Sequence, residues 1–149
     1  MISILVSVAG SLVTGGCNNT KEQRALAVAG AAEFLVKYND QAFTEMYDEA
    51  DLYVHRKASR RWWMERCSSV RAELGALKDF KPMTNNDYPI GNVGIVWVSG
   101  PAISESGPAT LRLDWEIRSG SPKLFNFQVE RGAGTSTISV PGYTAKVLR

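Results

Sequence analysis

Apolar residues recur every three or four positions through most of the first half of the chain. The clearest series lies in residues 60–80 and follows Ser59, a residue type that often caps the start of a helix. It consists of Trp63, Cys67, Val70, Leu74 and Leu77. This spacing predicts a helix with one buried face. It also places Cys67 on that face, where a thiol behaves as a small hydrophobic group.

Two other helices are predicted ahead of this one. Residues 20–38 are rich in helix formers, and their apolar series is Ala25, Val28, Ala32, Leu35 and Tyr38. Residues 39–53 form a shorter helix, for which Asn39 or Asp40 is a suitable N-cap. Its apolar side consists of Phe43, Met46, Tyr47 and Ala50.

After Pro82 the pattern changes to the period of two that is typical of strands. The predicted strands are residues 92–100, 109–118, 123–131 and 135–143, with a turn at 119–122 and a long hairpin loop at 99–108. In the second strand we expect Leu111, Leu113, Trp115 and Ile117 to face the core, and Arg112, Asp114, Glu116 and Arg118 to face water. In the third, Phe125, Phe127 and Val129 are expected inward.

Helices followed by an antiparallel sheet indicate the α+β class. We therefore expect N-terminal helices packed on a curved antiparallel sheet of about four strands. The 149 residues suit one domain, and 44% hydrophobic with 21% charged residues is an ordinary globular composition. A net charge of +2 carries no argument for nucleic acid as a partner.

The N-terminal run, residues 2–16, is uncharged and ends at Cys17. It is shorter than the roughly 20 apolar residues that span a bilayer, and it is typical of a signal-peptide core. Small residues lead directly into Cys17 and polar chain follows, an arrangement that resembles a bacterial lipobox. This resemblance implies removal of residues 1–16, a lipid on Cys17, a tether over 17–24, a domain over 25–149 and attachment to the cell envelope.

Two other interpretations of Cys17 are open. An even number of cysteines allows a disulfide with Cys67 in an oxidising compartment. The two residues are equally compatible with unrelated reduced thiols. Lipidation is favoured because a disulfide does not explain the uncharged run that ends at the cysteine.

The order of elements resembles the nuclear transport factor 2-like superfamily, and within it a small bacterial exported branch without an assigned function. The resemblance rests on the tryptophan-led helix ending in "ELGALKDF", the strands after it, and the late "VPGY", and it spans Lys21 to Tyr143. It implies a cone-shaped fold. Enzymes of this superfamily work inside the cone, and its sheets commonly dimerise through the open face.

The motifs of common cofactor and metal sites are absent from the sequence. One His and two distant Cys give no zinc spacing, and there is no phosphate-binding loop, hydrolase elbow or dinucleotide fingerprint. We expect no metal and no cofactor. His55 and Asp51 are weak candidates for catalysis, and Asp48 and Tyr88 are the remaining ones. All are weak because acid–base catalysis needs a correctly positioned partner group as well as a suitable pKa.

A basic cluster, Arg56, Lys57, Arg60 and Arg61, surrounds the expected start of the third helix. It is a candidate site for an anion or an anionic headgroup, because free N–H groups at a helix start attract negative charge. The alternative is that these side chains pair with the acids Asp48, Glu49 and Asp51 across the turn.

Four aromatic residues are candidates for an interface or pocket: Trp62, Trp63, Trp115 and Tyr88. The leading functional hypothesis is a noncatalytic domain of an envelope lipoprotein, held at the membrane through Cys17, that binds a protein, a peptide or a small apolar ligand. A small pocket enzyme of the hydrolase or isomerase type and a dimeric assembly scaffold, hence a homodimer, are the alternatives.

Overall fold

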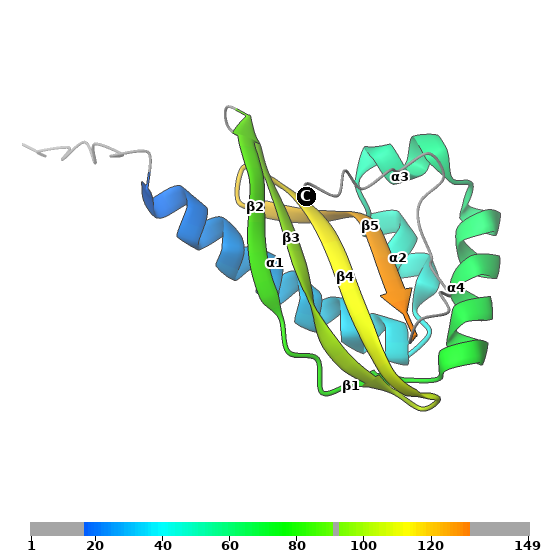
Figure 1. Ribbon diagram of the computed structural model, residues 1–149. Helices are drawn as coiled ribbons and strands as arrows, with labels where there is room; N and C mark the ends of the chain where they lie inside the picture. Colours follow the sequence, from blue (N-terminus) through cyan, green and yellow to red (C-terminus); the bar gives the residue numbers. More distant parts are fainter. Residues whose placement is uncertain (1–16, 91–92, 132–149) are drawn as a thin grey trace, which may run out of the picture.

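Helices come first and strands follow in the computed structural model (Figure 1). It describes residues 17–90 and 93–131, with side chains described for 20–84 and 95–131. The helices are α1 (Cys17–Asn39), α2 (Phe43–Glu49), α3 (Leu52–Lys57) and α4 (Arg60–Leu74). The strands are β1 (Leu77–Lys78), β2 (Met83–Ile90), β3 (Val93–Ser104), β4 (Gly107–Arg118) and β5 (Ser121–Glu130). The predicted α+β class is confirmed.

All strand pairs that the structure describes are antiparallel. The order is β1-β3-β4-β5, and β2 also pairs with β3, so the two share one edge of β3. The apolar side chains of the sheet pack against the helices in one core, which draws on all four helices and on β1, β3, β4 and β5. The predicted sheet of about four strands therefore lacked β1 and β2, whose segments are short or rich in polar residues.

The prediction of a long hairpin loop over residues 99–108 is wrong. Strand β3 runs to Ser104 and β4 starts at Gly107, so only two residues form the turn. By contrast, the predicted turn at 119–122 is confirmed: Ser119 and Gly120 have φ of 51° and 78°, the pair of positive values that suits a two-residue hairpin. The predicted strand at 135–143 lies outside the described residues.

Helix α4 buries the predicted face. Trp63, Cys67, Val70 and Leu74 are all buried, and Ser59 caps the helix by accepting a hydrogen bond from the Trp62 N–H. The helix stops six residues earlier than predicted, at Leu74. Gly75 follows with φ 76° and ψ −158°, a conformation that is essentially restricted to glycine.

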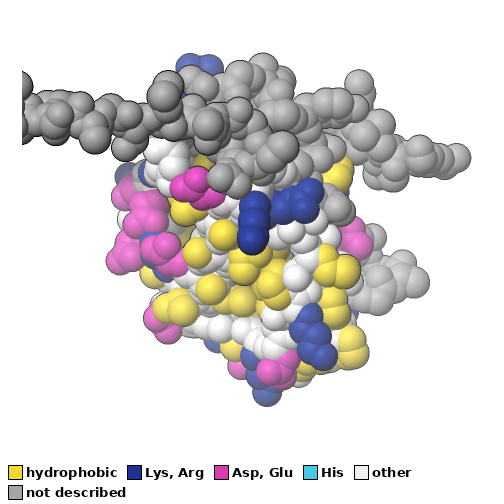
Figure 2. Space-filling model, turned by 90° about the vertical axis from the view of Figure 1, so that its left-hand side faces the viewer, with side chains coloured by type: hydrophobic (Ala, Val, Ile, Leu, Met, Phe, Trp, Pro, Cys, Tyr) yellow, Lys and Arg dark blue, Asp and Glu magenta, His cyan; other side chains and the backbone are white. Residues whose placement is uncertain are grey.

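Helix α1 turns a different face to the core from the one predicted. Its buried residues are Gln23, Ala27, Gly30, Ala31, Phe34 and Tyr38, so only Tyr38 of the predicted series is buried. Figure 2 shows hydrophobic side chains gathered on the molecular face that carries the N-terminal end of α1 and the edge strand β2. The helix also begins at Cys17, so residues 17–24, predicted as a tether, belong to the helix.

The second predicted helix is two helices, α2 and α3. Ala42 precedes α2 without a side-chain cap, which corrects the expectation for Asn39 and Asp40. The Asn39 side chain instead contacts Leu77, accepting from its N–H at 2.9 Å and donating to its carbonyl at 2.8 Å. It thereby ties the end of α1 to β1.

The alternation predicted for β4 holds for its apolar residues and fails at Asp114, which is 1% exposed. A register shift beside Asp114 also changes the phase of β5. Leu124 is therefore buried while Phe125 is only partly buried, contrary to expectation; Phe127 and Val129 are buried as predicted.

Candidate functional site

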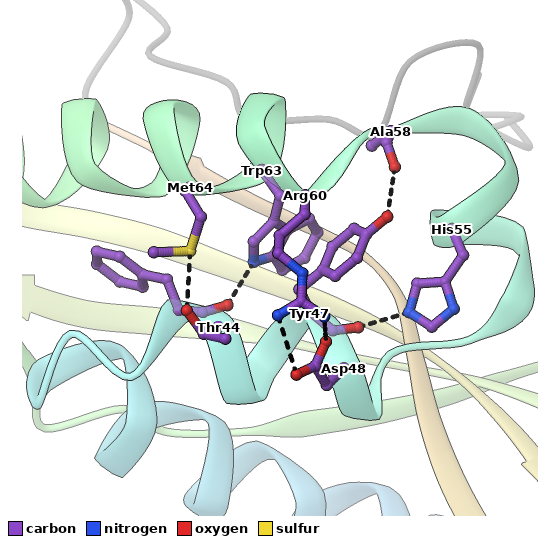
Figure 3. A network of polar contacts seen from close by, with 9 residues as sticks. Thr44, Tyr47, Asp48, His55, Ala58, Arg60, Trp63 and Met64 are labelled. Atoms are coloured by element: carbon purple, nitrogen blue, oxygen red, sulfur yellow. Dashed lines mark hydrogen bonds and ion pairs between the residues drawn. The ribbon is translucent and has the colours of Figure 1, made fainter.

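The two weak catalytic candidates have structural roles. The Asp51 side chain caps α3 by accepting a hydrogen bond of 2.7 Å from the Tyr53 N–H. His55 lies on α3, half-buried, with Nε2 at 2.6 Å from the Tyr47 carbonyl and its ring centroid 4.7 Å from the Tyr47 ring (Figure 3). Because a carbonyl only accepts, this nitrogen must carry the proton. His55 therefore holds the last turn of α2, and no carboxylate is among the contacts described for it.

Arg60 joins α4 to α2. Its guanidinium forms an ion pair with Asp48, including a hydrogen bond of 3.2 Å from Nη1 to Oδ2, and lies 5.5 Å from the Tyr47 ring centroid (Figure 3). The Tyr47 hydroxyl donates to the Ala58 carbonyl at 2.9 Å. Pairing across the turn is thus what the structure shows for Arg60, as the alternative reading of the basic cluster expected.

The other basic residues of the cluster do not converge on one point. Arg61 pairs with Glu65 of the same helix at 2.7 Å, and the Lys57 ammonium lies 6.0 Å from the Tyr53 ring centroid. Arg56 is exposed on α3. The prediction of an anion site at these four residues stays a prediction, and two of their three arginines, Arg60 and Arg61, are already engaged by carboxylates.

The aromatic candidates are divided between core and surface. Trp63 is 1% exposed and its indole N–H donates to the Phe43 carbonyl at 3.1 Å, so it is a core residue. Trp62 is partly buried against the same core. Tyr88 lies in β2, but its side chain is outside the described part of the chain. Trp115 lines a cavity.

This cavity, of about 120 Å³, lies between α1, α2 and the end of the β4–β5 hairpin. Its apolar wall consists of Phe34, Met46, Ala50, Trp115, Pro122 and Leu124. Gly30 of α1 faces the Trp115 ring so closely that a Cβ there would be 3.0 Å from the ring. The absence of a side chain at Gly30 therefore lets the helix approach the indole that forms part of the wall.

Charged side chains surround the opening of this cavity. They are Glu33 and Lys37 of α1, Glu49 of α2 and Lys123 of β5. Lys37 pairs with Glu33 at 3.0 Å and also with Glu49, which links the two helices. The hydrogen bond that the Lys37 ammonium donates to Glu49 raises its pKa, burial opposes this, and the hydrogen bond donated to Glu33 adds to the rise.

Trp115 also brings a buried polar group to this region. Its indole N–H is buried and has no hydrogen-bond acceptor in the part of the chain that the structure describes. A buried donor left without an acceptor costs about 1–3 kcal/mol. An apolar cavity with charged side chains in its lining is suited to hold the apolar part of a small molecule.

A second polar cluster, on the opposite face of the sheet, was missed by the sequence analysis. Asp114 accepts hydrogen bonds from Arg112 Nε at 2.8 Å and from Asn126 Nδ2 at 2.9 Å, and the Arg112 guanidinium lies 4.4 Å from the Trp97 ring centroid. Arg112 and Asp114 are two residues apart in β4, so their side chains lie on the same face of the strand and can pair. Nothing in the sequence pattern, however, indicates that Asp114 is buried on this face.

Within the described residues no helix is long and apolar enough to cross a membrane, and no three His, Cys, Asp or Glu side chains are grouped as metal ligands. Cys67 is a buried free thiol, so it is not joined to Cys17. The chain matches no model of a known protein family and no curated protein sequence.

Proposed function

We propose that this protein is a noncatalytic binding domain, attached to a bacterial envelope membrane by a lipid on Cys17, that holds a small, mostly apolar ligand between α1, α2 and the β4–β5 hairpin. The same proposal includes membership of the nuclear transport factor 2-like superfamily, in line with the order of helices before an antiparallel sheet. The observation that carries the ligand-binding part is the cavity beside Trp115.

The size of the cavity supports a modest ligand group. An engineered apolar cavity of about 150 Å³ in another protein binds benzene, so about 120 Å³ here accommodates a small ring or a short branched chain. The remainder of the ligand would lie among Glu33, Lys37, Glu49 and Lys123 at the opening. An oxygen that reached the Trp115 N–H would recover part of the cost of its burial.

Benzyl alcohol is a suitable probe, because it combines a ring of this size with an oxygen acceptor. We expect a saturable shift of the Trp115 indole N–H resonance on titration, with that resonance assigned through Trp115→Phe. Ala50→Leu places a larger side chain in the cavity wall and should weaken binding at least tenfold. Ala72→Leu, at an exposed position of α4, is the matched control. Equal binding by both variants would reject the cavity as the site.

The attachment has its own test. Protein purified from the membrane fraction of a bacterial host should begin at Cys17 and show by intact mass the addition of acyl chains. Several buried chains hold a protein firmly, at about 0.8 kcal/mol for each methylene. An unmodified Cys17 in that material would refute the anchor and leave the cavity proposal standing.

A further inference from the structure

Helix α1 carries a second apolar face. We name it the outward stripe, and its residues are Ala25, Val28, Ala29, Ala32, Leu35 and Val36. Four of these are exposed, and Val28 and Leu35 are partly buried. Val36 is 61% exposed. Their spacing of three and four residues keeps them on one side of the helix, and no charged residue interrupts them.

Apart from Leu35, which packs against the core from its margin, the outward stripe contributes no residue to the core that the helix already serves. At about 100° per residue, its centre lies about 150° around the helix from the buried face that includes Phe34 and Tyr38. The solvent side of such a helix normally carries charged and polar residues. In α1 the acids Glu22, Glu33 and Asp40 are at one margin of the stripe instead.

The position of Cys17 indicates what covers the stripe. Helix α1 begins at Cys17, so rigid helix directly joins the proposed lipid attachment to the stripe. Ala25 lies about 12 Å and Val36 about 28 Å from that end, at about 1.5 Å per residue. Lys21 and Arg24, both exposed, lie between the attachment and the stripe. Basic side chains at such positions are attracted to an anionic lipid surface.

We propose that α1 lies in the plane of the bilayer that holds Cys17, with the outward stripe in contact with lipid. This rests on the proposed lipid attachment. Three of the six side chains are alanines, so the stripe offers far less than the roughly 800 Å² per partner of a standard protein interface. A helix already held at the membrane needs little further affinity, because attachment sets a high effective concentration. The cavity opening, formed partly by Glu33 and Lys37 of the same helix, then lies near the lipid surface.

The test uses the full chain, acylated in a bacterial host and reconstituted in vesicles of phosphatidylethanolamine and phosphatidylglycerol. Ala29→Cys on the stripe and Ala72→Cys on the exposed side of α4 are labelled with an environment-sensitive fluorophore. Cys67 is buried and should stay unlabelled. Quenching by spin-labelled lipid should be at least twofold stronger at position 29 than at position 72.

The outcomes separate this inference from the function on which it rests. Protein that fails to float with the vesicles refutes the anchor and the membrane-facing stripe together. Flotation with equal quenching at positions 29 and 72 overturns only the stripe's contact with lipid. A disulfide between two copies through Ala29→Cys, without quenching at that position, would assign the stripe to a second copy and also overturn the proposal.

Discussion

Helices α1 and α4 follow the same spacing rule but use it differently. In helix α4 the apolar series forms one stripe, which is buried, and charged residues are distributed around the rest of the helix. Helix α1 has apolar residues on two sides, and the series most evident in its sequence lies largely outside the buried face. A hydrophobic period therefore identifies a helix, but it identifies the core face only where a single face is apolar.

The largest effect on stability is expected when one large side chain is removed from the buried face of each of these two helices. We expect Phe34→Ala in α1 and Trp63→Ala in α4 each to lower the free energy of unfolding by about 3–5 kcal/mol, because both leave cavities in one shared core. Both residues contact Phe127. Urea denaturation followed by circular dichroism measures the change. A loss under about 1 kcal/mol at Phe34 would mean that α1 is not part of the same core.

The end of α4 gives the next largest effect. Gly75→Ala should cost about 1–3 kcal/mol, because a non-glycine residue is strained in this conformation and its Cβ would meet the Glu105 side chain at 2.1 Å. Gly120→Ala is the matched control, since Gly120 also has positive φ but open space around it. The difference between the two losses of unfolding free energy measures what Gly75 adds beyond a positive φ, namely its extended ψ and the contact with Glu105. Equal losses would show that backbone strain alone accounts for the glycine.

Alkaline pH probes the buried stripe of α4. Burial raises the pKa of the Cys67 thiol from 9.0 to about 12, so above pH 9 the unfolded chain loses this proton and the folded chain keeps it. The free energy of unfolding should then fall as pH rises from 9, by at most about 1.4 kcal/mol for each pH unit. Burial also raises the pKa of Tyr38 from 10.0 to about 12, which adds to the fall above pH 10.

Cys67→Ala separates the two groups. Denaturation curves at pH 9 and pH 10 should differ less for this variant than for the native chain, because the thiol has the lower unfolded-state pKa of the two groups and contributes more of the loss below pH 10 than Tyr38 does. An unchanged difference would contradict the role of Cys67.

The smallest effect is expected on the outward stripe. Val36→Ala should change the free energy of unfolding of the Cys17→Ser chain by no more than about 0.5 kcal/mol, as is usual for surface positions. The same denaturation experiment as for Phe34→Ala applies. A loss comparable to that at Phe34 would show that α1 has no distinction between a core face and an outward face.

The sequence predicted the structure best where a local pattern was compatible with only one conformation. The residues from Trp63 to Leu74 could bury only one helix face, and residues 119–120 could form only a tight turn between alternating strands. The β2 segment, "MTNNDYPI", has a proline and few apolar residues, so its pairing with β3 depends on the neighbour rather than on its own composition.

The candidate site divides in the same way. Trp115 was predicted to face inward from its strand and was named as a candidate pocket or interface residue, and it lines the cavity. Its partners Gly30, Ala50 and Lys37 come from other elements, and no local pattern relates them. Asp114 was expected in water because alternation makes no allowance for a hydrogen-bonding neighbour such as Asn126 on the next strand.

By itself, the sequence determined the class of the fold, the face of α4 and β4 that packs inward, and the uncharged run that ends at Cys17, because period and charge act along a single segment. The tertiary structure decided which side of α1 is buried, that Asp114 is covered, and that a cavity forms beside Trp115. Each of these depends on residues brought together from separate elements, and their mutual packing is encoded in no single stretch of the chain.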